Sequence, residues 1–388
     1  MSTTHTELEL EAIRICQELI RIPSVNFGDG KGDEKAVADY VAKLLSEVGI
    51  EPTIYESAPG RCNVIARIKG KNPQRPGLVV HGHIDVVPVN ADDWTVDPFG
   101  AEIKDGYIWG RGAVDMKNMD AMILATVRDW ARTGFVPDRD IVLAFFADEE
   151  AGSVYGSHYM VKEHPEVFAG CTEAVSEVGG FSVTVAGGKR LYLIETAEKG
   201  IHWMRLTADG RAGHGSMMND DNAITSLSEA VAKIGRFEWP QRYSKTVKAF
   251  FKRIAEETGK PYNEEDLRPL LKEIGFASSM IGATLQNTAN PTMLDAGYKA
   301  NVIPGSATAT IDGRFIPGFE DELNSTIKSL IGENITVETI TRDKALEVPF
   351  EGDLVDAMCN ALVKEDSVAI PVPYVMSGGT DNKALADL

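Results

Sequence analysis

Apolar residues in the first half of the chain follow two alternating patterns. Some recur every three or four positions, as in a helix with one buried face, and others form short continuous runs, as in strands covered on both faces. Because the two kinds of segment alternate up to about residue 196, the sequence predicts an α/β domain with a doubly wound mixed sheet. The predicted helices cover residues 9–20, 36–48 and 116–133, and the predicted strands cover residues 63–68, 78–80 and 140–147, with a further short strand from residue 174.

The pattern changes after residue 196, where strands that alternate apolar and polar positions become common. We expect an α+β domain over residues 197–341, inserted into a first domain made of residues 1–196 and 342–388. Its predicted strands cover residues 201–209, 279–285, 295–298, 307–311 and 335–340, and its predicted helices cover residues 223–234, 245–257 and 320–331.

Polar residues capable of chemistry follow the predicted buried strand at residues 78–80. His83 and Asp85 are two positions apart, so on extended backbone their side chains project to the same side. A carboxylate beside an imidazole can fix its tautomer and raise its basicity, as is usual for a metal-bound histidine. The simpler alternative is a histidine in a loop, with Asp85 capping a turn.

Carboxylates mark three further junctions. Asp115 precedes the predicted helix 116–133, where it could bind a metal or merely cap the helix. Asp148, Glu149 and Glu150 follow the apolar run 141–146, and Glu177 follows the next strand. Adjacent acids at the end of a buried strand repel one another unless a cation or solvent is near, so a solvated acidic turn is the weaker interpretation.

Composition narrows the function classes. The chain has 388 residues and a formal net charge of -19, so it lacks the basic excess that a nucleic-acid partner would require. The four cysteines form no CxxC pair, which favours free thiols in a reducing cytoplasm. The sequence shows neither a secretory signal pattern at residues 1–7 nor an apolar run of roughly 20 residues, so we expect a cytoplasmic protein that does not bind membranes.

The strand-end residues taken together suggest a metal site. One imidazole, His83, with the carboxylates of Asp115, Glu150 and Glu177 suits zinc, manganese or cobalt better than magnesium or copper. Two neighbouring metals would need a bridging carboxylate, and could hold a hydroxide that attacks a carbonyl. A free carboxylate must then move the proton, and Glu149 is the candidate because adjacent residues on extended chain point apart.

The motifs at residues 82–88, 110–117, 148–152, 177–180 and 377–381 resemble those of the M20 family of metallopeptidases and amidohydrolases, in the family's order. This family includes aminoacylases, carboxypeptidases of the G2 and S type, dipeptidases, and the deacylases of arginine and diaminopimelate synthesis. The resemblance covers nearly the whole chain and implies a catalytic domain with an inserted lid and dimerisation domain.

The resemblance implies a role for each residue of the metal site. Asp115 would bridge two zinc ions, His83 and Glu177 would complete the first, and Glu150 would belong to the second. Asp85 would orient His83, and Glu149 would serve as general base and acid.

The resemblance also implies roles for three residues of the inserted domain. His214 matches a histidine that reaches an active site, often that of the partner subunit in a homodimer, to stabilise the oxyanion. Asn301 and Arg314 match residues that grip the substrate carboxylate, for which a bidentate guanidinium is well suited. The alternatives are a turn former for Asn301 and a surface salt bridge for Arg314.

One ligand of the family pattern is missing. The family takes its last metal ligand from a histidine well after the 377–381 loop, and here no histidine follows His214. The helix predicted after Thr380 or Asp381 also has no stop signal. We therefore expect a chain truncated at its C-terminus that holds its second metal weakly and has reduced activity.

The sequence thus predicts a metal-dependent hydrolase that cleaves an amide or peptide bond next to a free carboxylate, in a dipeptide or an N-acyl amino acid. One alternative is a biosynthetic deacylase of acetyl or succinyl amino acids. An alternative of another class is a non-catalytic metal- or ligand-binding protein on the same fold, although no metal requires Glu149. A nucleotide-binding enzyme is disfavoured because no GxGxxG or Walker loop follows a strand.

Overall fold

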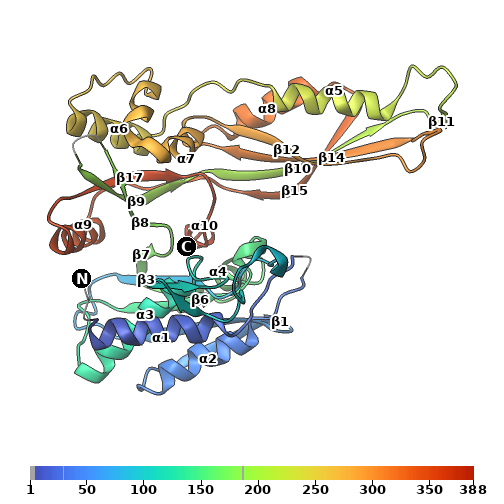
Figure 1. Cartoon of the computed structure of the whole chain (residues 1–388). Coiled ribbons are helices and arrows are strands. Elements are labelled where there is room, and N and C mark those ends of the chain that lie inside the picture. The colour runs from blue at the N-terminus through green and yellow to red at the C-terminus, as the bar shows by residue number, and fades with distance from the viewer. Residues whose placement is uncertain (1–4, 29, 186–187) are drawn as a thin grey trace. The chain divides into compact units, whose positions relative to one another are not determined.

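The computed structural model describes residues 5–28, 30–185 and 188–388. The chain folds into two compact units, one made of Met1–Glu177 and Thr380–Leu388 and the other of Val178–Gly379 (Figure 1). Residues 1–4, part of the segment for which the sequence predicts no secretory signal, lie outside the described residues.

A mixed sheet forms the centre of the first unit. Its strand order is β1-β2-β6-β3-β7, and the pairs β6–β3 and β3–β7 are parallel whereas β1–β2 and β2–β6 are antiparallel. The strands are β1 (Pro52–Ala58), β2 (Arg61–Ile68), β3 (Gly77–His83), β6 (Ile141–Phe146) and β7 (Cys171–Val175).

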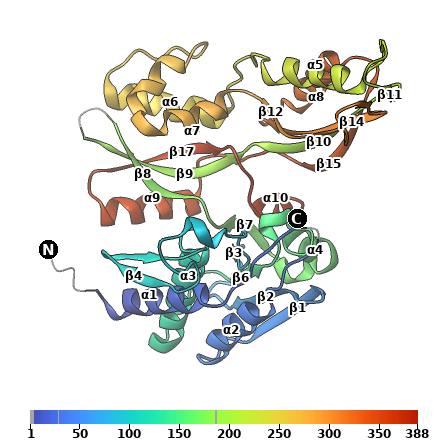
Figure 2. The same ribbon diagram turned by 45° about the vertical axis from the view of Figure 1, so that its right-hand side comes forward.

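Helices cover both faces of this sheet (Figure 2). Every residue of β6 is buried, because alternate side chains of this apolar run pack against opposite helical layers. On one face Val142, Ala144 and Phe146 pack with residues of α4 and α10, including Met160 and Leu385. The helices of the unit are α1 (Glu7–Ile20), α2 (Lys35–Ser46), α3 (Lys117–Thr133), α4 (Ser157–Glu163) and α10 (Asn382–Leu385).

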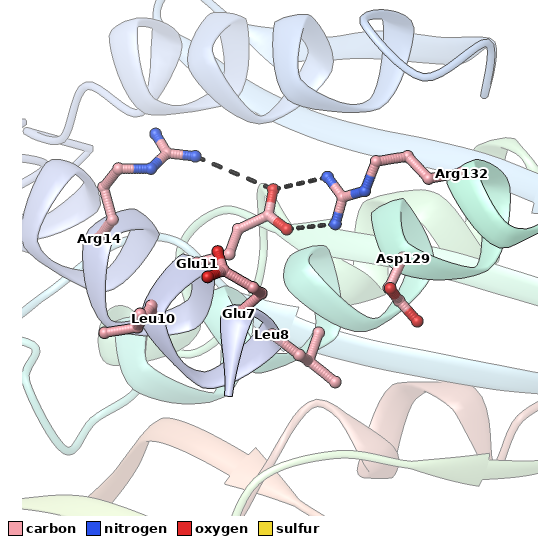
Figure 3. A pocket seen from close by; sticks show the side chains of 7 residues that line it. All are labelled: Glu7, Leu8, Leu10, Glu11, Arg14, Asp129 and Arg132. Atoms are coloured by element: carbon pink, nitrogen blue, oxygen red, sulfur yellow. Dashed lines mark hydrogen bonds and ion pairs between the residues drawn. The ribbon is translucent and has the colours of Figure 1, made fainter. Parts of the chain in front are cut away.

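Ion pairs join α1 to α3 away from the strand ends. The Glu11 carboxylate on α1 pairs with Arg128 and Arg132 on α3, and more loosely with Arg14. Figure 3 shows this carboxylate between Arg14 and Arg132, in a pocket between the two helices. Because its own ion pairs neutralise Glu11, we assign no function to this pocket.

The second unit contains an antiparallel sheet in the order β12-β14-β10-β15. Alternate residues of β10, such as Met204 and Leu206, pack against Leu227 of α5 and Leu323 of α8. These elements are β10 (Gly200–Asp209), β12 (Thr288–Ala296), β14 (Ser306–Phe315), β15 (Ile335–Asp343), α5 (Ala223–Gly235) and α8 (Glu320–Ile331).

Another sheet of the second unit joins segments distant in the sequence. Strand β9 pairs with β17 in parallel and with β8 and β16 antiparallel. Its apolar side chains pack with α6 and with the helical turns that follow it. These elements are β8 (Gly179–Thr184), β9 (Arg190–Glu198), β16 (Leu346–Glu347), β17 (Ala369–Met376), α6 (Lys245–Thr258), η4 (Arg268–Ala277) and α7 (Ser278–Gly282).

The remaining elements are short or peripheral. Strands β4 and β5 form a hairpin, and β11 pairs with β13. The bounds are β4 (Glu102–Lys104), β5 (Tyr107–Trp109), β11 (Gly213–His214), β13 (Val302–Ile303), α9 (Asp353–Glu365), η1 (Ala91–Asp93), η2 (Glu149–Ala151), η3 (Pro165–Phe168) and η5 (Ala283–Leu285).

The structure differs from the sequence prediction most clearly at residues 279–285 and at the boundaries of the units. Residues 279–285, predicted as a strand, form α7 and a following turn of helix, so this prediction was wrong. The compact units divide at Glu177 and Gly379, whereas the predicted boundaries were 196/197 and 341/342. The boundary differs because β8, β9 and β17 share a sheet and a core with α6 and its neighbours.

Among the described residues, no helix is both long enough and apolar enough to cross a lipid bilayer. Cys16, Cys62, Cys171 and Cys359 are free. The predicted fold class, an α/β unit with an additional α+β sheet domain, is confirmed.

Candidate metal centre

His83 lies at the centre of a group of carboxylates. It ends β3 and is 1% exposed. Its Nε2 atom lies 2.9 Å from Asp115 Oδ1, 3.7 Å from Glu177 Oε2 and 3.8 Å from Glu149 Oε2. The structure therefore brings carboxylates from three separate segments to one imidazole.

The strand order explains this convergence. Strands β6, β3 and β7 are parallel neighbours, so their carboxyl ends meet at one edge of the sheet. Glu149 and Glu150 follow β6, His83 ends β3, and Glu177 follows β7. Asp115 reaches the same edge from the loop that leads into α3.

Two overlapping sets of ligand atoms could each hold an ion. His83, Glu149 and Glu177 form one set, and His83, Asp115 and Glu150 form the other, with the ligand atoms of each set within 4.8 Å of one another. One imidazole and several carboxylates fit a divalent cation such as zinc, manganese or cobalt. The donor set therefore suits a metal, as expected from the sequence.

Glu149 lies closer to these ligands than the sequence argument assumed. That argument relied on neighbouring residues of an extended chain pointing apart, but Glu149 and Glu150 lie in the 3-10 turn η2. In this turn both side chains approach His83. The geometry therefore does not separate the two glutamates into one ligand and one free carboxylate.

The electrostatics of the cluster are those of a site for positive charge. Burial raises the pKa of Glu149 well above its usual range, and nearby Glu177 raises it further. Burial also raises the pKa of Glu150, to about 7. Burial alone would lower the pKa of His83, but Asp115, Asp85 and Glu177 hold it well above the usual value. Clustered acids with raised pKa values are stabilised by a bound cation.

Asp85 contacts both His83 and the turn that carries the glutamates. Its backbone oxygen lies 3.1 Å from His83 Nδ1 and its Oδ1 lies 3.4 Å from the same atom. The carboxylate also accepts hydrogen bonds from the backbone N–H groups of Glu149 and Glu150, each at 3.2 Å. Asp85 thus holds the His83 imidazole in one orientation and connects the ends of β3 and β6.

Asp115 does not act as a helix cap. Helix α3 begins at Lys117, its N-cap residue is Met116, and no side-chain capping bond is present there among the described residues. The Asp115 carboxylate instead faces His83, and this hydrogen bond lowers its pKa. The geometry favours the ligand interpretation over the capping one.

Asp381 lies near enough to the candidate metal centre for its charge to act on Glu149, although the sequence predicted no role for it in the site. It is 2% exposed and accepts hydrogen bonds from Ser153 Oγ at 2.7 Å and Ser157 Oγ at 2.6 Å. Burial raises its pKa to about 7, with a contribution from Glu177. The signal was its place at the end of the 377–381 motif.

His214 and Asn301 lie together in the second unit. Strand β11 pairs with β13, and the pairing brings His214 opposite Val302. His214 Nε2 lies 3.5 Å from Asn301 Nδ2, and its Nδ1 lies 2.8 Å from Ser216 Oγ. Both side chains are exposed. The structure thus pairs two residues that the sequence suggested separately.

Arg314 forms an internal ion pair in the second unit. Its Nε and Nη2 atoms donate to the two oxygens of Asp312 at 2.6 and 3.1 Å. The guanidinium also lies over the ring of Trp203, 5.8 Å from its centre. The salt-bridge alternative therefore describes its contacts in this structure.

Comparison with known proteins gives consistent matches. The family model described as Peptidase family M20/M25/M40 matches residues 79–387. N-fatty-acyl-amino acid synthase/hydrolase PM20D1 of Xenopus tropicalis is 26% identical over 390 residues, covering 95% of this chain and 75% of its own length. Human aminoacylase-1 is 27% identical over 394 residues, covering 99% of this chain and 86% of its own length.

A solved structure supports the same fold. The M20 family metallo-carboxypeptidase Sso-CP2 from Sulfolobus solfataricus superimposes with a TM-score of 0.71 at 18% identity. The match covers 98% of this chain and 89% of that one. At this identity the likeness establishes the architecture and leaves the reaction to be argued from the residues.

Proposed function

Because the chain belongs to Peptidase family M20/M25/M40, we propose that it hydrolyses an amide or peptide bond next to a free carboxylate. The substrate would be a dipeptide or an N-acyl amino acid. The observation that carries this proposal is the convergence of His83, Asp115, Glu149, Glu150 and Glu177 at one edge of the sheet. The names of the relatives, aminoacylase-1 and PM20D1 among them, favour acyl amino acids as the first class to test.

The metal would be held by His83, Asp115, Glu150 and Glu177. We propose that this site would bind zinc, up to two ions, with cobalt or manganese as functional substitutes. When bound, such ions polarise a carbonyl and lower the pKa of a water molecule.

The chain's own residues would move the proton. Glu149 lies in the turn beside His83, and burial raises its pKa well above its usual range, which makes it a better proton acceptor than an exposed glutamate. We propose that it takes the proton from the attacking water and passes it to the leaving amine. Asp85, bonded to His83 and to the Glu149 backbone N–H, would hold both in place.

Residues of the second unit would bind the substrate. His214, beside Asn301, would donate to the oxyanion, and in a homodimer formed through residues 197–341 it could serve the partner's active site. Arg314 would bind the substrate carboxylate. To do so, its guanidinium must either bind Asp312 and the substrate together or release Asp312.

A substrate panel tests the proposal. The chain is freed of metal with a chelator and then loaded with zinc, cobalt or manganese. Dipeptides and N-acetyl, N-succinyl and long-chain N-acyl amino acids are assayed, each beside its C-terminal carboxamide. We expect hydrolysis of the free acids and little of the carboxamides. A preference for acetyl or succinyl amino acids would favour the biosynthetic deacylase. Absence of turnover with metal bound would instead favour a non-catalytic binding protein.

A further inference from the structure

A chain of buried polar groups extends from Asp85 to the start of β2. Arg61, the first residue of β2, is 1% exposed. Its Nε and Nη2 atoms donate to the two oxygens of Glu34 at 2.7 and 2.8 Å. Nη2 also donates to Asp148 Oδ1 at 2.7 Å. The buried carboxylates of Glu34 and Asp148 therefore share the Arg61 guanidinium.

Asp148 links Arg61 to the candidate metal centre through further hydrogen bonds. Its Oδ1 also accepts a hydrogen bond from Asn26 Nδ2 at 3.0 Å, and its Oδ2 accepts one from the backbone N–H of Tyr155 at 3.0 Å. The same Asn26 Nδ2 donates to Asp85 Oδ2 at 2.9 Å. Both oxygens of Asp148 are thereby fixed, and Asn26 joins Asp148 to Asp85.

The turn that carries Glu149 and Glu150 is held from two sides. On one side Asp85 accepts the backbone N–H groups of both glutamates. On the other, Asp148 begins the turn with a φ of 69°, which is unfavourable for a residue with a side chain and persists only when its surroundings hold it. Arg61 and Asn26 supply that support through the Asp148 carboxylate.

We propose that Arg61 is a positioning residue for the metal centre: through Asp148 it fixes the turn that directs Glu149 and Glu150 toward His83. The catalytic consequence rests on the proposed function. The consequence for cation binding does not, because it depends only on the placement of the glutamates.

A purely structural role for Arg61 is the competing explanation. In that case its task is to neutralise Glu34, which lies fully buried beside it. Burial and the nearby Asp85 raise the pKa of Glu34 to about 7, and Arg61 opposes them. The double variant Arg61→Met/Glu34→Gln removes both members of this pair, so no unpaired Glu34 charge remains. A structural role predicts that this variant keeps the cobalt affinity and kcat of the wild type. A positioning role predicts that both remain reduced, because Asp148 has lost its Arg61 partner.

Arg67 provides a matched control on the same strand. Its Nη1 donates to Asp140 at 3.0 Å, and its Nη2 donates to the backbone oxygens of Val167 and Ala169. Arg67→Met thus removes an arginine with an ion pair and two backbone contacts, but none of these partners is in the turn that holds the glutamates.

The experiment compares Arg61→Met/Glu34→Gln with Arg67→Met and the wild type. Cobalt(II) is titrated into each metal-free protein to measure its dissociation constant, and kcat is measured at saturating metal and substrate. Thermal unfolding reports stability. Outer partners of metal ligands typically change affinity or activity by about 10- to 100-fold, so we expect losses of that size in the double variant. Arg67→Met should lose stability yet keep both constants within about twofold of the wild type.

Equal cobalt affinity and kcat in the double variant and in Arg67→Met would overturn the inference. Should the double variant fail to fold, Arg61→Lys is compared with Arg67→Lys by the same two constants, because lysine keeps the charge but lacks the fork that spans Glu34 and Asp148. A wild type that binds cobalt but hydrolyses no substrate would contradict the proposed function, and the cobalt titrations would still decide the role of Arg61.

Discussion

The two compact units hold their candidate functional residues in opposite ways. In the first unit His83 and Asp85 are almost completely buried, and hydrogen bonds connect them to the turn at Glu149 and Glu150. In the second unit His214 and Asn301 are exposed on a short two-stranded pairing. If the candidate ligands bind a cation as proposed, its affinity would depend on residues of the first unit. Turnover would depend on both units, and substitutions can separate the two properties.

The largest effect is expected from His83→Asn. This change removes the imidazole common to both candidate ligand sets. Tight cobalt binding should disappear, and kcat/KM should fall by more than about 10⁴-fold, because Lewis-acid and proton-transfer assistance are lost together. Calorimetric cobalt titration and steady-state kinetics measure the two effects. Retention of both would remove the basis for a metal centre here.

Glu149→Gln should separate chemistry from binding within the first unit. The amide keeps the size of the side chain but cannot accept the proton, so kcat should fall by about 10² to 10⁴-fold. Cobalt affinity should change far less than in His83→Asn, although Glu149 belongs to one ligand set. Glu166→Gln, an exposed change on η3, serves as the control. Turnover close to that of the wild type would show that another group moves the proton.

His214→Ala should affect turnover and leave the metal centre unchanged. Loss of one oxyanion donor usually lowers kcat by about 10² to 10³-fold. The side chain of His214 contacts Ser216 and Asn301, and neither belongs to the two candidate ligand sets of the first unit. The cobalt affinity of His214→Ala should therefore match that of the wild type. Mixing His214→Ala with Glu149→Gln subunits then tests a homodimer, because restored activity requires that one subunit supply its histidine to the other.

The smallest effect concerns the pH dependence of stability. The pKa of Glu34 is raised to about 7 by burial and by Asp85, with Asp148 adding to the rise and Arg61 opposing it. The folded state therefore binds more protons than the unfolded state between about pH 4.5 and 7, and stability from this group falls as the pH rises through that window. In denaturant unfolding of the metal-free protein, the free energy of unfolding should decline less with rising pH in Glu34→Gln than in the wild type. The difference should be roughly 1 to 3 kcal/mol across the window. Identical profiles would contradict the burial argument.

The cluster of ligand-type residues around His83 could be predicted from the sequence because its signals are local. Strands β3 and β6 are largely apolar and lead directly into ligand-type residues, and Glu177 follows β7; parallel neighbours place these ends at one edge. Arg61 and Asn26 carry no such signal. Their importance depends on Glu34, Asp148 and Asp85, which come from other segments of the chain.

The errors in the fold have a similar origin. Residues 279–285 form a short apolar segment whose periodicity does not distinguish strand from helix. The helical form places Ile281 and Leu285, four positions apart, in the same core cluster. The predicted boundary placed β9 and β17 in one domain but assigned α6 to the other, because nothing local in either strand identifies the helix that packs on it.

The order of β6, β3 and β7 has a consequence for the way this protein folds. The ligands at positions 83, 149 and 177 are neighbours only after those strands have aligned, and bringing together distant segments is a slow, entropically costly step. An ion would therefore find few competent partners in the disordered polypeptide and would bind late. Added metal should lengthen the lifetime of the native state far more than it hastens its formation.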